Sequence, residues 1–372
     1  MRYDAAVIGL GAVGSAALQE LARRGAKAIG FDAYDPPHAH GSSHGDTRLV
    51  RVAYAEGEMY VPLARRSVAL WRRLNQASGE AVFHPDGVFY AGPCDGSMIA
   101  GVRRSAERWS IALEASPQCD PAALPDGWTS VFEPEGGYVR PEAAIAAYLR
   151  AAEGAGARVR RRTKVSGVTR AAGVWRIETQ GGETVTADTV LLAVGGWTGT
   201  LRPALAGLLS IQRRVHVWFD PADTTMVEGR WPAFAFQDET GCWFYGAPAA
   251  RGGRGVKLSP HHGDDPAVSA DGVDRTIRPS DSARSKAFAQ RVLPSLGPVI
   301  DQEACFYTMS PDGHFIIDDS VRAEGLMAIT GLSGHGFKFA AALGEHAALR
   351  LSGAPAELDL SAFSPVRFAS SR

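Results

Sequence analysis

The feature that most constrains this chain is a glycine motif near its N-terminus, placed between an apolar strand pattern and a helical pattern. Residues 3–8 predict a short buried strand, and the run Gly-Leu-Gly-Ala-Val-Gly at 9–14 follows it at once. Helical periodicity covers residues 15–24, and a second strand over 28–31 ends at Asp32. This order of strand, glycine turn, helix, strand and acid predicts the first half of a doubly wound sheet.

The glycine motif also predicts a dinucleotide site. Gly9 permits the tight turn, Gly11 lets the backbone approach a pyrophosphate, and Gly14 lets the helix pack closely on the strand. The helix N-terminus offers unpaired N–H groups to phosphates, and Asp32 can accept hydrogen bonds from ribose hydroxyls. The motif does not distinguish FAD from NAD, and it fails as a Walker A loop because no Lys follows Gly14.

Composition limits the class of partner. The 372 residues suffice for about two domains, and 39 basic against 40 acidic residues leave a net charge of -1, so neither nucleic acid nor an anionic membrane is indicated. No apolar run reaches the roughly 18 residues of a membrane span, and the chain begins with a strand pattern, so a cytoplasmic protein is expected. The cysteines lack the CxxC spacing of a metal site and are expected as buried thiols: Cys94, Cys119, Cys242 and Cys305.

The middle of the chain has the pattern of a β excursion that returns to the central sheet. Strands are predicted at 159–168, 174–179, 184–187 and 189–194, with Gly195-Gly196 after the last. Residues 207–291 are again strand-like and predict an antiparallel sheet in a second domain.

A second glycine turn stands near the C-terminus. Strands are predicted at 315–318 and 326–330, the turn spans 331–338, and a helix is expected over 339–351. A strand that runs into a glycine turn at a helix start is a further place to hold an anion. The turn does not match the GxSxG nucleophile elbow of serine hydrolases, because the residue two after Ser333 is His335 and not Gly.

Several strings in one order along the chain resemble the monomeric sarcosine oxidase and N-methyl-L-tryptophan oxidase family. The longest is 38–51, His-Ala-His-Gly-Ser-Ser-His-Gly-Asp-Thr-Arg-Leu-Val-Arg, and the match continues at Phe244-Tyr245-Gly246, Lys257-Leu258, Ser310-Pro311-Asp312 and the turn 331–338. The family's paired histidines before Gly-Asp-Thr-Arg are replaced here by Ser43-His44, a departure that bears on flavin attachment.

The resemblance implies an α/β fold of α+β two-domain type: a Rossmann-like FAD-binding domain of glutathione-reductase type beside an antiparallel-sheet substrate domain. The expected FAD domain is discontinuous, at 1–82, 140–208 and 308–372, and the expected substrate domain covers 83–139 and 209–307.

The resemblance also implies an FAD-dependent oxidase of N-methyl or other secondary amino acids. Oxygen would be the electron acceptor, the products would be an aldehyde, an amino acid and hydrogen peroxide, and the protein would be a monomer. In this family the flavin is tethered to a cysteine, and Cys305 is the residue in that position.

Roles carry over residue by residue. Arg51 and Lys338 resemble the family's pair of residues that holds the substrate carboxylate. A guanidinium can bind a carboxylate through two hydrogen bonds, and an ammonium adds a positive point charge. Lys257 matches the oxygen-activating lysine, and the other positions assigned to catalysis are Arg48, His261, Tyr245 and Tyr307. The remaining positions assigned to the cofactor are Gly9, Gly11, Val13, Gly14, Asp32, Ser42, His44, Val165, Gly195, Gly334, His335, Gly336 and Phe337.

Alternatives stay open at this level. The substrate can be a cyclic secondary amine such as pipecolate, and the glycine motif alone also fits a pyridine-nucleotide dehydrogenase or a flavin-binding redox protein without turnover. The histidines at 38, 40, 44, 261 and 262 show no recognised ligand spacing, so no metal is predicted.

Overall fold

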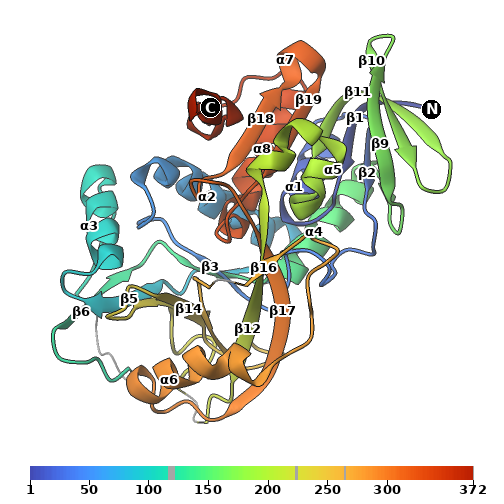
Figure 1. Ribbon diagram of the computed structural model, residues 1–372. Helices are drawn as coiled ribbons and strands as arrows, with labels where there is room; N and C mark the ends of the chain where they lie inside the picture. Colours follow the sequence, from blue (N-terminus) through green and yellow to red (C-terminus); the bar gives the residue numbers. More distant parts are fainter. Residues whose placement is uncertain (116–121, 223–224, 264, 372) are drawn as a thin grey trace.

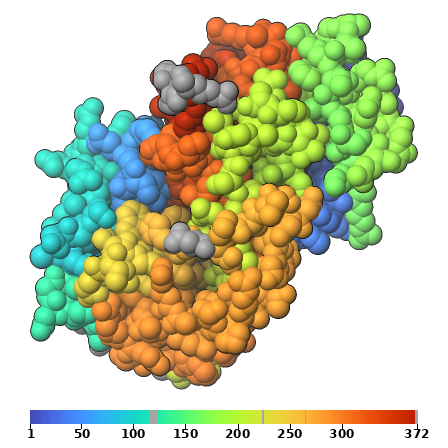
Figure 2. Space-filling view, in the orientation of Figure 1, coloured from blue at the N-terminus to red at the C-terminus, as the bar shows by residue number. Residues whose placement is uncertain are grey.

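Two large sheets organise the molecule, which was analysed as a computed structural model (Figure 1). The structure describes all residues except 116–121, 223–224, 264 and 372. Figure 2 shows the β excursion, in green, and the segment 250–300, in yellow to orange, at opposite ends of one face of the molecule.

The first sheet is the doubly wound one. Its strand order is β18-β19-β11-β1-β2-β8, and every neighbouring pair is parallel except β18 with β19. A hairpin of β9 and β10 adds to β11. The strands are β1 (Arg2–Ile8), β2 (Ala28–Phe31), β8 (Arg158–Arg160), β9 (Val165–Ala171), β10 (Val174–Thr179), β11 (Thr184–Leu192), β18 (Ile316–Ser320) and β19 (Leu326–Thr330).

Helices cover the first sheet because their apolar faces need a partner. Helix α1 (Ala12–Arg23) packs against α4 (Pro141–Gly154) and α8 (Ala340–Leu351), and α8 packs against α2 (Val61–Ser78). The α1 and α8 backbones approach so closely that a Cβ on Gly344 would lie 2.6 Å from the Cβ of Ala16. Gly344 and Ala16 thus let α8 lie close to α1, and the turn 331–338 that precedes α8 comes near the first glycine motif.

The second sheet has the order β16-β12-β15-β14-β13-β5-β6, with β17 paired to the other edge of β12. Neighbouring strands are antiparallel except β5 with β13. Helix α6 (Ala283–Val292) packs on it through Phe288, whose ring stacks on Phe244 at 4.1 Å between centroids. The strands are β5 (Val88–Pro93), β6 (Trp128–Glu133), β12 (Ser210–Phe219), β13 (Ala233–Gln237), β14 (Trp243–Ala247), β15 (Val256–Pro260), β16 (Pro266–Ala267) and β17 (Val299–Met309).

A small third sheet lies between the other two. It consists of β3 (Arg48–Val50), β7 (Gly137–Val139) and β4 (Phe83–His84), in the order β3-β7-β4. The remaining α-helices are α3 (Ser97–Trp109), α5 (Thr198–Leu201) and α7 (Val321–Glu324). Strand β3 carries Arg48, and the residue just beyond its end is Arg51. No helix in the described part of the chain combines the length and the apolar character that a bilayer crossing needs.

The predicted mixed α/β fold class is confirmed, and so is the Rossmann-like order of the first sheet. The strands of this sheet fall within the ranges expected for the FAD domain, while the division into two domains stays a prediction.

Three local predictions were wrong. The two strands expected at 184–187 and 189–194 are the single strand β11. One edge of β11 pairs with β10 at 184–187 and with β19 at 190–192, and the other edge pairs with β1. The strand expected at 159–168 is broken between β8 and β9, where Arg162 has a φ of 52°. The strand-like segment 207–291 contains most of α6.

The cysteine prediction was partly wrong. Cys94 is exposed, whereas Cys242 and Cys305 are buried free thiols, and Cys119 lies outside the described residues.

Candidate active site

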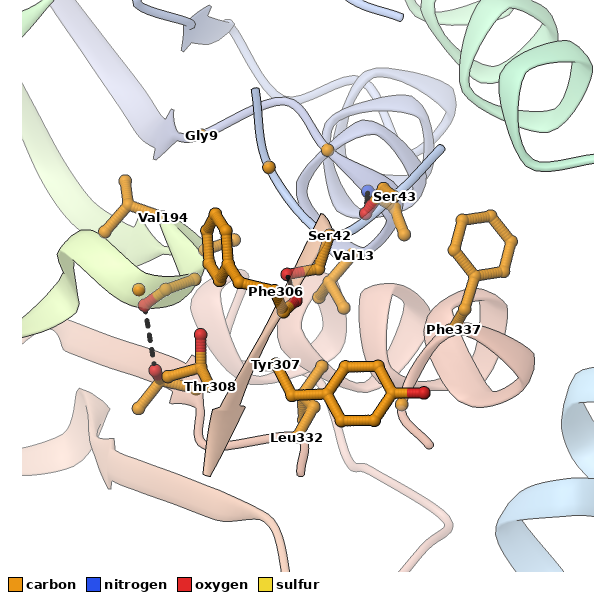
Figure 3. A pocket seen from close by; sticks show the side chains of 18 of the residues that line it. Gly9, Val13, Ser42, Ser43, Val194, Phe306, Tyr307, Thr308, Leu332 and Phe337 are labelled. Carbon is orange, nitrogen blue, oxygen red and sulfur yellow. Dashed lines mark hydrogen bonds between the residues drawn. The ribbon is translucent and has the colours of Figure 1, made fainter. Parts of the chain in front are cut away.

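A long cavity is lined by the first glycine motif, by the second glycine turn and by strands of the second sheet (Figure 3). Most of the residues assigned to the site from sequence line this cavity. They are Gly9, Gly11, Val13, Asp32, Ser42, Arg48, Arg51, Val165, Gly195, Tyr245, His261, Tyr307, Gly334, His335, Gly336, Phe337 and Lys338. Four do not line it and lie behind its wall: Gly14, His44, Lys257 and Cys305.

At one end the first glycine motif is built as a dinucleotide cradle. Gly9 has a φ of +88°, and a Cβ on Gly14 would lie 1.8 Å from the Gly9 carbonyl oxygen, so neither position admits a side chain. Helix α1 starts at Ala12 with Gly11 as its N-cap and no acidic residue in its first turn. Its backbone N–H groups are therefore directed at the cavity without a carboxylate to compete with a phosphate.

The acid at the end of β2 has a fixed orientation. Asp32 accepts hydrogen bonds from the backbone N–H of Leu10 at 2.8 Å and of Tyr34 at 2.9 Å, and its Oδ1 lies 3.1 Å from Nε2 of His38. A carboxylate has about four lone-pair sites, so Asp32 retains acceptor capacity for ribose hydroxyls.

Ser43, where the family has a histidine, contacts this cradle. Its Oγ accepts a hydrogen bond from the backbone N–H of Ala12 at 3.4 Å, as Figure 3 shows. The neighbouring Ser42 donates from its Oγ to the carbonyl of Phe306 at 2.6 Å. The departure from the family pattern thus places a hydroxyl at the start of α1.

The second glycine turn lies against the aromatic wall. Gly334 has a φ of +81°, and a Cβ there would come within 2.3 Å of the Tyr307 ring. A Cβ on Gly336 would lie 2.4 Å from the Cβ of Leu332. This turn therefore presents backbone to the cavity between the two glycine motifs. The backbone N–H donors of the two turns, and the space left by their glycines, fit FAD.

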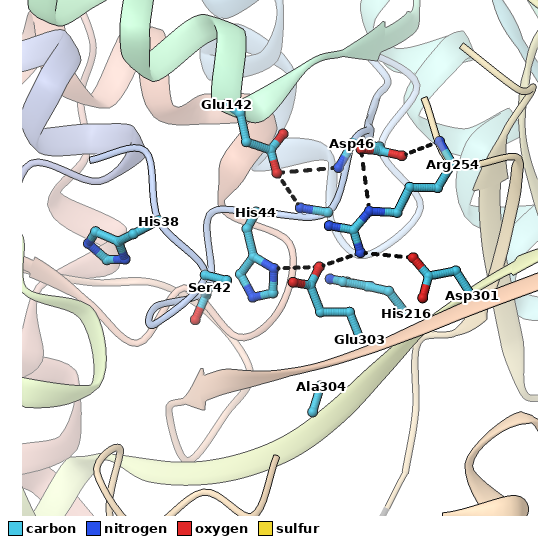
Figure 4. A network of polar contacts seen from close by, with 12 residues as sticks. His38, Ser42, His44, Asp46, Glu142, His216, Arg254, Asp301, Glu303 and Ala304 are labelled. Carbon is cyan, nitrogen blue, oxygen red and sulfur yellow. Dashed lines mark hydrogen bonds and ion pairs between the residues drawn. The ribbon is translucent and has the colours of Figure 1, made fainter. Parts of the chain in front are cut away.

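The segment 44–48 is held by the network of polar contacts in Figure 4. His44 is buried and its Nδ1 lies 3.1 Å from Glu303 Oε2, which also pairs with Arg254 at 3.0 Å. Glu142 of α4 accepts from the Gly45 N–H at 2.6 Å. Burial lowers the pKa of His44 despite the Glu303 carboxylate, and His44 Nε2 has no partner among the described residues.

Cys305 lies on β17, opposite Arg214 of β12 in the antiparallel register. Because side chains alternate along a strand, Cys305 faces the same side as Tyr307, which lines the cavity. Burial raises the pKa of the Cys305 thiol, and the cations Arg48 and Lys257 oppose that rise. The thiol thus lies just behind the wall, among positive charges that favour its thiolate.

Arg51 and Lys338 both line the cavity, as predicted for a carboxylate site. Arg51 Nη2 forms an ion pair with Glu56, whereas Arg51 Nε and Nη1 are buried without a hydrogen-bond partner among the described residues. Lys338 Nζ donates to the His335 carbonyl at 2.9 Å and lies 3.4 Å from the Tyr54 hydroxyl.

The charges of this cluster depend on one another. Burial alone would raise the pKa of Glu56, but Arg51 and Lys338 lower it to about 2. Burial and Arg51 lower the pKa of Lys338 well below its ordinary value, and Glu56 offsets part of that shift. Among the described residues, this cluster therefore sets Arg51 and Lys338 against the one carboxylate of Glu56, and a second carboxylate here would favour the protonated form of Lys338.

Lys257 of β15 is 1% exposed and donates to the carbonyls of Gly45 at 2.9 Å and Thr47 at 3.1 Å. Burial and the charge of Arg48 lower its pKa well below the ordinary value. Its ammonium thus contacts the backbone of the segment that carries Arg48, which donates from Nη2 to the Ser42 carbonyl at 3.1 Å.

Aromatic and imidazole rings complete the wall. The hydroxyls of Tyr245 and Tyr307 are 3.3 Å apart, and the ring of His261 lies 5.6 Å from that of Tyr307. Burial raises the pKa of both tyrosines and lowers that of His261 well below its ordinary value. Burial, together with Lys338, lowers the pKa of His335 to about 4, so these rings are neutral at pH 7.

Sequence reasoning missed several residues of this site. Glu56, Tyr54 and Glu303 gave no signal of their own, although Glu56 stands five positions after Arg51. Trp243, which lines the cavity with Arg51 5.9 Å from its ring, and the buried His216 were also missed. No group of three or more His, Cys, Asp or Glu side chains in the described residues is placed to hold a metal ion.

Comparisons with known proteins cover almost the entire chain. Residues 4–350 match the family described as FAD dependent oxidoreductase. The chain is 38% identical over 379 residues to an N-methyl-L-tryptophan oxidase of Salmonella dublin, covering 99% of this chain and 100% of the relative. The identity is also 38%, over 376 residues and with the same coverage, to an N-methyl-L-tryptophan oxidase of Yersinia pestis.

Solved structures share the fold. NikD, an unusual amino acid oxidase essential for nikkomycin biosynthesis, superposes with a TM-score of 0.85 at 22% identity, over 98% of this chain and 97% of its own. Glycine oxidase from Geobacillus kaustophilus gives 0.76 at 19% identity, with 98% of each chain covered. The paired glycine cradles, the acid after β2 and these full-length matches show that the chain belongs to the FAD-dependent oxidoreductase family, as its resemblance to the sarcosine and N-methyltryptophan oxidases predicts.

Proposed function

We propose that this protein is an oxidase of N-methyl or other secondary amino acids, which uses oxygen and releases an aldehyde, the demethylated amino acid and hydrogen peroxide. The observation that carries the proposal is the state of Arg51: two of its guanidinium nitrogens are buried at the cavity wall without a partner among the described residues. Buried donors of this kind are costly to leave unmet, and a carboxylate is the acceptor that suits them.

The residues around Arg51 support an amino acid as the ligand. A carboxylate held by Arg51 and Lys338 would leave the amine among the rings of Tyr245, Tyr307 and His261. Arg51 and Lys338 lower the pKa of a nearby amine, because their positive charge disfavours its protonated form. The neutral rings of the wall carry no negative charge that would stabilise a protonated amine. A neutral nitrogen keeps the lone pair that assists removal of hydride from the adjacent carbon.

FAD, when bound, supplies the acceptor for that hydride and passes the electrons to oxygen. The proposal includes a covalent link to Cys305, supported by the place of this thiol on the same strand face as Tyr307 and by the nearby cations. It also includes a role for Lys257 in the oxygen reaction, supported by its burial beside Arg48, because a positive charge excluded from water stabilises negative charge strongly.

The side chain of the substrate is the least defined part of the proposal. The 38% identical relatives are N-methyl-L-tryptophan oxidases, and Trp243 supplies apolar wall on the side of the second sheet. These features favour a bulky apolar or aromatic side chain over the bare methylene of sarcosine. Monomeric state and cytoplasmic location stay predictions, which sedimentation and cell fractionation test.

The test is an oxygen-consumption and peroxide assay of the purified yellow protein over a panel of amino acids. N-methyl-L-tryptophan, sarcosine, pipecolate, L-tryptophan and glycine form the panel, and N-methyltryptamine, which lacks a carboxylate, is the control. We expect peroxide and formaldehyde in equal amounts with an N-methyl amino acid and no turnover of the control. Absence of peroxide with every member, from protein that retains FAD, would contradict the proposal.

A further inference from the structure

His216 connects two residues of the cavity wall without lining the cavity itself. It lies on β12, is 1% exposed, and appears in Figure 4 beside the network of His44 and Glu303. Arg48 Nη2 lies 3.1 Å from His216 Nε2, and the Tyr245 hydroxyl lies 3.4 Å from His216 Nδ1. Both of these partners line the cavity.

The ring of His216 is fixed from a third side by backbone. A Cβ on Gly45, which has a φ of +102°, would lie 2.7 Å from His216 Cδ2. The segment 44–48 thus packs directly on the imidazole edge, and it does so because residue 45 has no side chain. A rotation of the ring about χ2 would cost both hydrogen bonds at once.

Basic groups dominate the electrostatics of His216, and Glu303, its cross-strand neighbour on β17, pairs instead with His44 and Arg254. Burial lowers the pKa of His216 well below its ordinary value, and Lys257, Arg48, His44 and Arg254 lower it further. No carboxylate among the described residues contacts the ring. The imidazole is therefore neutral, with one N–H and one lone pair.

The partners decide which nitrogen carries the hydrogen. A guanidinium has only N–H donors, so Nε2 must accept the bond from Arg48. The single ring hydrogen is then on Nδ1, where it is donated to the Tyr245 oxygen. Tyr245 in turn can donate its own hydroxyl hydrogen to Tyr307, 3.3 Å away.

We propose that His216 is a positioning residue for the active site, which holds Arg48 through Nε2 and directs the Tyr245 hydroxyl toward Tyr307 through Nδ1–H. The chain of donors runs in one direction, from Arg48 through His216 and Tyr245 to Tyr307. It links the Arg48 guanidinium to the Tyr245 and Tyr307 hydroxyls at the cavity wall. The kinetic part of this inference rests on the proposed oxidase function, whereas the tautomer does not.

The first test is nitrogen NMR of protein labelled with 15N-histidine, recorded between pH 6 and pH 9. The chain has 10 histidines, and the His216 signals are those that disappear in the His216→Gln variant. We expect a neutral ring with the hydrogen on Nδ1 throughout this range. A ring protonated on Nε2 alone, or one that titrates in this range, would overturn the assignment even in an enzyme with full activity.

The second test separates the two bonds with three variants. His216→Asn keeps a donor near the Nδ1 position and loses the acceptor for Arg48, His216→Gln keeps an acceptor in reach of Arg48 and loses the separate donor, and His216→Leu loses both. We expect His216→Gln and His216→Leu to raise KM for the amino acid substrate about three- to tenfold, as one lost hydrogen bond allows. We expect His216→Asn and His216→Leu to shift the flavin absorption band.

The matched control is His346→Gln, because His346 is also a buried histidine but lies on α8 outside the cavity wall. It should change neither KM nor the absorption band. Equal effects of the three His216 variants that follow only their loss of thermal stability would reduce His216 to a structural residue and overturn the proposal. Unchanged KM and spectrum in all three would overturn it as well.

Discussion

Arg51 and Glu56 form a partly buried ion pair at the wall of the cavity, and the pair uses only one edge of the guanidinium. Arg51 Nη2 contacts the carboxylate, while its Nε and Nη1 stay unmatched among the described residues. The Arg51 charge lies 4.4 Å from the centre of the Tyr54 ring, which fixes it from the side. Glu56 therefore stabilises the buried cation without occupying the edge that a substrate carboxylate needs.

Replacement of Arg51 by Gln should lower kcat/KM for an N-methyl amino acid by about 100-fold or more, because a charged hydrogen-bonding pair contributes about 1.5–3 kcal/mol per bond and two are lost. Steady-state oxygen consumption measures the change. Since Arg51→Gln leaves the partly buried Glu56 carboxylate without this partner, the double variant with Glu56→Gln is the control for folding. It should recover thermal stability but not kcat/KM; recovery of both would argue against a carboxylate site.

Replacement of Lys257 by Met should slow the reaction of the reduced protein with oxygen by about 100-fold or more, and it should change the anaerobic reduction by substrate far less. The reason is that a buried ammonium stabilises negative charge most where water is absent. Stopped-flow spectroscopy measures both half-reactions. Lys286→Met, at an exposed position of α6, is the control. Equal slowing of the two half-reactions would remove the oxygen-specific role.

The Cys305→Ala variant should release all of its flavin on denaturation, whereas the wild-type protein and the Cys242→Ala variant should retain it. Cys242 is the matched control because it is also a buried free thiol, but it stands just before β14 and its Sγ contacts Arg284 of α6. Mass spectrometry of the denatured chains reads the result directly. Flavin retained on Cys305→Ala, or lost from all three proteins, would refute the tether at this position.

Much of the first sheet was predictable because its signals are local. The turn at Gly9 requires a positive φ, the close packing at Gly14 admits no side chain, and both facts act within a few residues of the strand they follow. Strands β2 and β19 have the bounds that the apolar runs predict. The error at β11 has a different origin, since one edge of that strand changes partner from β10 to β19 along its length and no local pattern records where.

Most positions assigned to the site from sequence line the cavity, whereas the side chains that hold them in place gave no signal of their own. Arg51 and Lys338 lie within matched strings, but Glu56 becomes meaningful only when the fold places it against Arg51. His216 shows the limit most clearly, because both of its partners come from other strands and its contact with the segment 44–48 depends on a missing side chain at Gly45. Such contacts connect residues about 30 to 170 positions apart, beyond any periodicity in the sequence.

Acid should destabilise the protein partly through Glu303. In the folded state His44 and Arg254 outweigh burial and lower the pKa of Glu303 to about 2, from an ordinary value near 4.5. A carboxyl group with a depressed folded pKa stabilises the fold above its unfolded pKa, and this contribution disappears as the pH falls from about 4.5 to about 2. Denaturant titrations from pH 6 to pH 3 measure it.

The Glu303→Gln variant supplies the comparison for that measurement. Its unfolding free energy should be lower than that of the wild type at pH 6, and the difference should shrink toward pH 3. The exposed ion pair of Arg150 with Glu80 provides a control, because Glu80→Gln should change the pH dependence little. A wild-type to Glu303→Gln difference that stays constant with pH would contradict the assignment.

The central claim is that the cavity binds an amino acid by its carboxylate, through Arg51 and Lys338. The most direct measurement compares kcat/KM for N-methyl-L-tryptophan and for N-methyl-L-tryptophanamide, each at its pH-independent plateau, in the wild type and in Arg51→Gln. The account predicts that the amide is at least about 100-fold poorer for the wild type, by loss of two charged hydrogen bonds, and that Arg51→Gln removes most of this preference. An amide oxidised as well as the acid by the wild type would contradict it.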